Sequence, residues 1–170
     1  DHAYSQLLEG KSFGLVAKEF SDDETYECEI GREVFPEKVD AVAFEKGKTL
    51  TLNVEDNIEY FGDIQSVKNI VNILIDNAVK HADNGGDVNL TLKKESTKIV
   101  LSVFNTGSQI PDDDVDKIFE RFYRGDTSRS RDSGGSGLGL SIAKSIADRN
   151  KWKISAKSKL NESMVITVIF

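Results

Sequence analysis

Three groups of residues, far apart in the 170-residue chain, have types and spacings that suit phosphate, metal or purine chemistry. In the first group, Asn77, Lys80 and His81 stand at i, i+3 and i+4, so on a helix they project along one edge. An amide oxygen is a ligand for Mg²⁺, and an ammonium group one turn away neutralises a phosphate. The alternative interpretation is the ordinary polar flank of an amphipathic helix.

The second group is residues 103–110 (VFNTGSQI) at the end of a predicted strand, with Asn105-Thr106-Gly107 inside it and Ile110 at its end. Asn105 offers both a donor and an acceptor, as the edge of a purine requires. Gly107 has no side chain, so the backbone can approach a flat ring closely. A plain Asn-Thr-Gly turn explains the same residues, and the pattern alone leaves both interpretations open.

The third group is the glycine-rich stretch of residues 134–140 (GGSGLGL), which runs into an amphipathic segment. Glycines leave consecutive amides free to surround an anion, and the following helix adds the partial positive charge of its amino end. A flexible linker is the alternative. It is the weaker one, because linkers rarely carry leucines at alternate positions before a helix.

The elements that must position these groups follow from hydrophobic periodicity and turn residues. Apolar residues recur at steps of three and four from Ile64 to Ala78, and Asn84-Gly85-Gly86 ends that helix. Further helices are predicted over residues 36–47, 113–121 and 138–149. Strands are predicted over residues 49–54, 87–93, 98–105, 152–157 and 164–170.

Helices and strands therefore interleave, yet two strand pairs are joined directly by short turns. This order predicts an α/β (α+β) two-layer sandwich: a mixed, mostly antiparallel sheet of about five strands backed by three helices on one face. The glycine patterns of Rossmann and P-loop nucleotide sites are absent from the sequence. Residues 1–29 are predicted to be an amino-terminal appendage, and residues 30–170 the main domain.

Composition excludes several classes of function. The net charge of −7 argues against nucleic acid as a partner, because phosphate backbones select basic surfaces. The single cysteine and the distant pair His2 and His81 predict neither a disulfide nor a histidine–cysteine metal cluster. No apolar run reaches the roughly 18 residues of a membrane span. Arginines outnumber acids between Glu120 and Ser133, which fits either a solvated loop or a local anion site.

Taken in order, the motifs resemble those of bacterial sensor histidine kinases. Residues 75–81 (IDNAVKH) resemble the N box, residues 105–107 (NTG) the G1 box, residues 118–124 (IFERFYR) the F box and residues 135–140 (GSGLGL) the G2 box. The resemblance covers about residues 30–170. It implies the Bergerat-type ATP-binding fold that these kinases share with DNA gyrase.

The resemblance also implies that the domain binds ATP with Mg²⁺. Asn77 would be the metal ligand, and Asn77 and Lys80 the residues that serve catalysis. Residues 112–133 would be a mobile lid over the ATP, with Phe119 and Phe122 packing its base and Arg124 near the phosphates. The implied nucleotide-binding set is Asn77, Lys80, His81, Asn105, Gly107, Ile110, Phe119, Phe122, Arg124, Gly135, Ser136, Gly137, Leu138, Gly139 and Leu140.

The implied reaction is transfer of the γ-phosphoryl group of ATP to a histidine on a separate dimerisation domain. Neither His2 nor His81 stands in the sequence context of such an acceptor, and residues 1–11 would be the tail of the acceptor hairpin. A response-regulator receiver domain is the implied second partner. The whole protein would be a homodimer, with this domain on the cytoplasmic side of a membrane-anchored sensor.

Two departures from the family pattern bear on activity. Asn105 stands where the family usually has Asp, and its carbonyl can still accept the adenine amino proton. Ile73 stands where the family often has a second Asn and where hydrolytic relatives carry a water-activating Glu, so we expect poor ATP hydrolysis. Two alternatives remain: an anti-sigma serine kinase of the same fold, and a non-catalytic nucleotide-sensing module.

Overall fold

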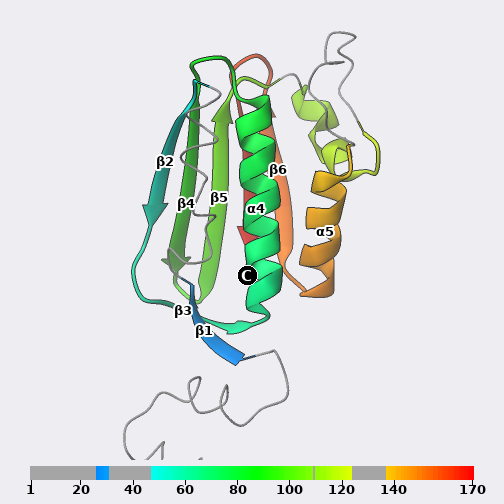
Figure 1. The fold of residues 1–170 in the computed structure, drawn as a ribbon. Coiled ribbons are helices and arrows are strands. Elements are labelled where there is room, and N and C mark those ends of the chain that lie inside the picture. Colours follow the sequence, from blue (N-terminus) through cyan, green and yellow to red (C-terminus); the bar gives the residue numbers. More distant parts are fainter. Residues whose placement is uncertain (1–25, 31–46, 109, 124–136) are drawn as a thin grey trace, which may run out of the picture.

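The computed structural model describes residues 26–30, 47–108, 110–123 and 137–170. Within these ranges seven strands, two α-helices and one 3-10 helix follow one another (Figure 1). The strands are β1 Tyr26–Ile30, β2 Thr49–Val54, β3 Ile58–Gly62, β4 Asp87–Glu95, β5 Lys98–Thr106, β6 Lys153–Lys159 and β7 Ser163–Ile169. The helices are α4 Ile64–His81, the 3-10 helix η2 Asp112–Phe119 and α5 Gly139–Arg149.

Five strands form one mixed sheet in the order β2-β4-β5-β7-β6. Only β2 and β4 pair in parallel, whereas β4–β5, β5–β7 and β6–β7 are antiparallel. Helices α4 and α5 lie side by side on the same face of this sheet (Figure 1). The predicted two-layer sandwich with a mixed, mostly antiparallel five-stranded sheet is therefore confirmed.

The core lies between α4 and the covered face of the sheet. Asp63 caps the amino end of helix α4, and its carboxylate accepts hydrogen bonds from the Gln65 backbone N–H at 2.9 Å and from the Ser66 hydroxyl at 2.6 Å. Every third or fourth side chain then enters the core, as the sequence period predicts. The side chains with at most 2% of their surface exposed include Val67, Ile70, Val71, Leu74, Val88, Leu90, Leu101, Val103 and Val168.

A second cluster closes the end of the sheet where α4 begins. Trp152 donates its indole N–H to the Tyr60 hydroxyl at 2.8 Å, and both rings meet Phe170 edge to face. This cluster attaches β3 to the main sheet, and β3 in turn pairs with β1 in a separate two-stranded sheet.

The elements differ from expectation at three places. Strand β3 is not predicted from sequence, because its five residues give too short a pattern. The helix expected over residues 113–121 is a 3-10 helix, Asp112–Phe119. Strand β1 crosses the predicted boundary between residues 29 and 30 and pairs within the main domain. The helices expected over residues 36–47 and at residues 1–11 lie outside the described residues.

Among the described residues, no helix combines the length and the apolar character that crossing a membrane requires.

Candidate functional site

The predicted motif segments meet at one end of the sheet. There α4 ends, β5 ends, the turn between β6 and β7 folds over, and α5 begins (Figure 1). These segments are separated by tens of residues in sequence. Their polar groups therefore converge only through the fold.

Asn77 lies on the edge of α4 that faces the start of α5. One turn earlier on the same edge, Ile73 packs against the amino end of α5, since a Cβ built on Gly139 would lie 3.6 Å from its Cγ2. Asn77 is partly buried, and its amide makes no hydrogen bond within the described ranges. A half-buried amide without a protein partner retains its oxygen for a ligand.

Lys80 and His81 continue this edge of α4 but are exposed to solvent. Lys80 forms an ion pair with Asp76, one turn back, with 39% and 58% of the two side chains exposed. An exposed pair of this kind contributes little to stability, so Lys80 can exchange Asp76 for a phosphate at small cost.

Asn105 is almost completely buried at the end of β5, with 2% of its surface exposed. Its Nδ2 donates to the backbone oxygens of Thr106 at 3.1 Å and Gly107 at 2.9 Å. Two carbonyls can only accept, so they fix the amide nitrogen inward and turn Oδ1 away. Oδ1 has no donor within the described part of the chain, which suits an acceptor for an exocyclic amino group.

Gly107 has a backbone conformation that disfavours a side chain, and the carboxylate of Asp83 occupies the place where one would begin. Its φ is +73°, and a Cβ at this position would lie 2.2 Å from Oδ1 of Asp83. Asp83 is held there because its own N–H donates to the Thr106 oxygen at 3.2 Å. The loop after α4 therefore packs directly on the turn after β5.

Two buried serines anchor the chain that follows this turn. The hydroxyl oxygens of Ser108 and Ser158 lie 2.5 Å apart. The exposed fraction of the surface is 4% for Ser108 and 5% for Ser158. Ser158 also donates to the Ile110 oxygen at 2.6 Å, and Ser108 accepts from the Ile110 N–H at 3.2 Å. The turn between β6 and β7 adds two backbone bonds, from Asn161 N to Ser108 O and from Gly107 N to Glu162 O, each 2.7 Å.

The 3-10 helix η2 occupies the first part of the expected lid. Its Ile118 is buried and Phe119 is partly buried against the core, so this part is attached to the domain. Phe122 does not pack as expected. It has a φ of +63° and 70% of its surface exposed, because the turn that directs its N–H to the Gly137 oxygen (3.0 Å) points the ring outward.

The end of the glycine-rich stretch forms the start of α5. Gly137 has a φ of +67°, and a Cβ there would lie 3.2 Å from Phe122 Cα, so a side chain would press on the neighbouring turn. Leu138 precedes the helix, and among the described residues no side chain caps it. Within that part of the chain the first-turn N–H groups near Gly139 and Leu140 have no side-chain acceptor, as at helix ends that bind anions.

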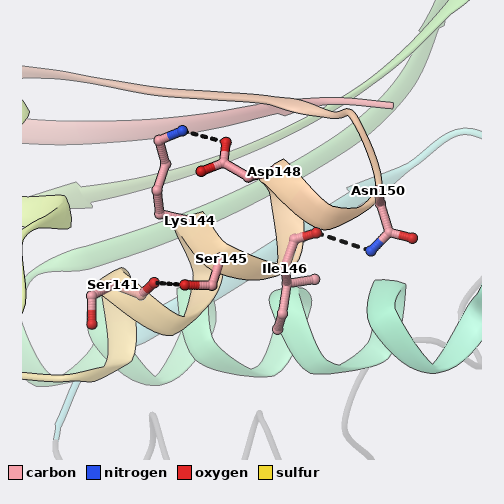
Figure 2. Close-up of polar contacts among 6 residues, drawn as sticks. All are labelled: Ser141, Lys144, Ser145, Ile146, Asp148 and Asn150. Atoms are coloured by element: carbon pink, nitrogen blue, oxygen red, sulfur yellow. Dashed lines mark hydrogen bonds and ion pairs between the residues drawn. The ribbon is translucent and has the colours of Figure 1, made fainter.

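The rest of α5 supports its own backbone (Figure 2). The Ser145 hydroxyl donates to the Ser141 oxygen at 2.9 Å, and Asn150 Nδ2 donates to the Ile146 oxygen at 2.9 Å. Lys144 pairs with Asp148 on the exposed side. These contacts stabilise the helix without using the groups at its amino end.

Three of the predicted binding residues, Arg124, Gly135 and Ser136, and the lid from residue 124 to 133 lie outside the described residues. Among the others, the fold brings Asn77, Asn105, Gly107, Ile110, Gly137, Leu138 and Gly139 to one end of the molecule. Sequence reasoning missed Asp83 and the Ser108–Ser158 pair. A serine at an inward position of β6, two residues from buried Ala156, was the available signal for the pair.

Residues 62–170 match the model of a protein family described as histidine kinase-, DNA gyrase B- and HSP90-like ATPases. The sensor histidine kinase YkoH of Bacillus subtilis is 39% identical over 108 residues, which are 64% of this chain and 23% of that protein. The signal transduction histidine-protein kinase BaeS of Escherichia coli is 33% identical over 123 residues, 72% of this chain and 26% of that protein.

Among solved structures, the mycobacterial sensor histidine kinase MprB superposes with a TM-score of 0.71 at 22% identity. The alignment covers 86% of this chain and 96% of that one, and it establishes the shared fold. This chain spans about a quarter of the length of the two curated relatives.

Proposed function

The chain belongs to the family of histidine kinase-, DNA gyrase B- and HSP90-like ATPases, and on that premise we propose that it is the ATP-binding catalytic domain of a two-component sensor histidine kinase. Its reaction would be transfer of the γ-phosphoryl group of MgATP to a histidine on a separate dimerisation domain. The observation that carries this proposal is the convergence of Asn77, Asn105 and the uncapped start of α5 at one end of the sheet.

The described residues fit an adenine nucleotide. The Oδ1 of buried Asn105, which has no donor among the described residues, would accept from the adenine amino group, and Gly107 would allow the ring to approach the backbone. The first-turn N–H groups of α5 and the Lys80 ammonium group provide donors and positive charge for the phosphates. In this proposal His81, Ile110 and Phe119 are the other described residues that would line the nucleotide site.

The site also fits Mg²⁺ held mostly by the nucleotide. No group of three or more His, Cys, Asp or Glu side chains that could hold a metal occurs among the described residues. Asn77 would therefore be the protein ligand, with phosphate and water oxygens as the others, which is the usual coordination of this ion. When bound, Mg²⁺ neutralises charge on the β- and γ-phosphates.

In the transfer, an imidazole nitrogen of the acceptor histidine forms a bond to the γ-phosphorus. The bond from that phosphorus to the bridging oxygen breaks, and ADP leaves. Nothing in this chain needs to form a covalent intermediate, because its residues position the nucleotide and neutralise charge. Ile73, packed beside Gly139, offers no group to activate water, which favours transfer over hydrolysis.

This proposal includes two partners: the acceptor domain and a response-regulator receiver domain. It also includes a homodimeric whole protein and a cytoplasmic location of this domain in a membrane-anchored sensor. They are supported by the family and by the roles of the two relatives as a sensor histidine kinase and a signal transduction histidine-protein kinase.

The decisive experiment compares Asn77→Ala with Asn72→Ala, an exposed position on the same helix. Both variants should melt within a few degrees of the wild type, since neither amide makes a hydrogen bond in the described ranges. Asn77→Ala should lose phosphoryl transfer to a supplied acceptor domain and lose the Mg²⁺ dependence of nucleotide binding. Asn72→Ala should retain both. Normal transfer by Asn77→Ala would exclude the metal assignment.

Lack of nucleotide binding by the wild type would exclude the proposed function as a whole. Binding of MgATP without transfer to any histidine acceptor would favour the nucleotide-sensing alternative instead.

A further inference from the structure

A lysine outside the predicted site caps the helix that carries Asn77. Lys48 stands immediately before β2, and its Nζ donates to the backbone oxygens of Val79 at 2.5 Å and Ala82 at 2.6 Å. Val79 lies in the last turn of α4 and Ala82 is its C-cap residue, so no further helical N–H is available to their oxygens. The side chain is partly buried.

The backbone beside Lys48 is tied to the same end of the fold. The Thr49 N–H donates to the Gly86 oxygen at 3.0 Å, where the parallel β2–β4 pair begins. Gly86 N in turn donates to the Asp83 oxygen at 2.9 Å, and Asp83 packs on Gly107. Lys48 therefore reaches α4 from the start of the edge strand β2 and from the side of the loop that supports the proposed adenine turn.

The position matters for charge as well as geometry. The carboxyl end of a helix carries roughly half a negative charge, concentrated in the last turn. Asn77 stands only four residues before the end of α4, and the chain as a whole carries a charge of −7. A triphosphate placed beside Asn77 would approach this negative end. The nearby Lys80 charge is already shared with Asp76.

We propose that Lys48 is a positioning residue of the nucleotide site that neutralises the carboxyl end of α4 for the polyphosphate. This inference rests on the proposed function, because it assumes that a nucleotide binds beside Asn77. Lys48 acts through the α4 carbonyls and is not itself assigned a contact with the nucleotide.

A purely structural role makes a different prediction. If Lys48 only holds the helix end in place, its loss lowers the melting temperature and weakens adenosine, ADP and ATP binding by the same factor. If Lys48 also neutralises the helix end, the loss of affinity grows with the number of phosphates, and salt reduces it.

The test is calorimetric titration of adenosine, ADP and a non-hydrolysable ATP analogue into the wild type and three variants. Lys48→Met removes the charge and keeps an apolar stem, whereas Lys48→Arg keeps the charge. Lys153→Met is the matched control, because it removes one positive charge from an exposed position on β6, near the opposite end of the domain.

We expect Lys48→Met to bind the ATP analogue about three- to tenfold more weakly, and adenosine less than about twofold more weakly. Lys48→Arg should recover most of the ATP affinity, and Lys153→Met should resemble the wild type. In an assay at about 0.5 M salt, the Debye length is roughly 4 Å, so charges are strongly screened. The difference in affinity for the ATP analogue between Lys48→Met and the wild type should then be smaller.

Equal factors for adenosine and the ATP analogue, or an unchanged affinity of Lys48→Met for the analogue, would overturn the inference and leave the proposed function standing. A wild type that binds none of the three ligands would overturn both. If Lys48→Met does not fold, Lys48→Gln replaces it, because it keeps a donor for one carbonyl and still removes the charge. The same two criteria then decide.

Discussion

Gly107 offers a test of how the loop after α4 packs against the turn after β5. Replacing Gly107 by Ala adds a methyl group at a φ of +73°, where it would lie 2.2 Å from Asp83 Oδ1. Gly85→Ala is the matched control. Its φ is +72°, and a Cβ there meets nothing within 4 Å.

The two variants separate backbone strain from crowding. An alanine in the left-handed region costs about 1–2 kcal/mol, part of which is offset by the lower entropy of the unfolded chain, so Gly85→Ala should lose about 1 kcal/mol. Gly107→Ala carries the same strain and must also displace a carboxylate whose backbone is bonded to Thr106. Because the atoms it meets are the far end of an exposed side chain, which rotates away more easily than a core residue, crowding should add at most about 1 kcal/mol, for a total of about 2 kcal/mol.

The measurement is urea denaturation of both variants, of Asp83→Ala and of the double variant Gly107→Ala/Asp83→Ala. The double variant should recover most of the difference between Gly107→Ala and Gly85→Ala, and the cycle should give a coupling energy of about 0.5–1 kcal/mol. Equal losses for Gly107→Ala and Gly85→Ala, with no coupling to Asp83, would refute the packing described for this turn.

Three further predictions concern the phosphate contact, the buried serines and the start of α4. Lys80→Ala should weaken binding of an ATP analogue about ten- to a hundredfold in calorimetric titration. The control Lys144→Ala, which breaks an equally exposed i,i+4 ion pair on α5, should leave the affinity unchanged. Equal affinities of the two variants for the analogue would remove Lys80 from the site. Ser158→Ala should lower the free energy of unfolding, measured by denaturant, by about 1–3 kcal/mol, because it removes one hydrogen-bond partner from Ser108 and one from the Ile110 oxygen. The Ser108→Ala/Ser158→Ala double variant should lose less free energy of unfolding than the sum of the two single variants. Strict additivity would contradict a direct contact between the two hydroxyls. The Ser66 hydroxyl lowers the pKa of Asp63 below its ordinary 3.8, so the cap stabilises the fold fully above that pH and loses this contribution as the pH falls through the lower folded value. The stability difference between wild type and Asp63→Asn, measured by urea denaturation from pH 7 down to pH 2, should therefore shrink only below about pH 4, and a difference that stays constant over this range would contradict an ionised cap.

Residue types and spacing determined the elements whose signal is local. The apolar period from Ile64 to Ala78 predicts α4, and the alternating residues on both sides of residues 95–97 predict the β4–β5 hairpin. Both elements can be predicted because α4 and the hairpin each bury one continuous face, and the apolar residues of that face recur in the sequence at a fixed period. The motifs at Asn77, Asn105 and Gly137 were found for the same reason, since each is a short run of consecutive residues.

Only the tertiary structure decided which distant groups share the site. Asp83 meets Gly107, Ser108 meets Ser158 across 50 residues, and Lys48 reaches the end of α4 across 31 and 34 residues. No local period encodes such contacts, because each arises from sheet order and from where a strand or helix ends. Phe122 shows the converse: its apolar side chain predicts packing, but a positive φ in a turn bonded to Gly137 directs the ring to solvent. Side-chain chemistry is a property of the sequence, whereas direction and neighbours follow from the backbone path in three dimensions.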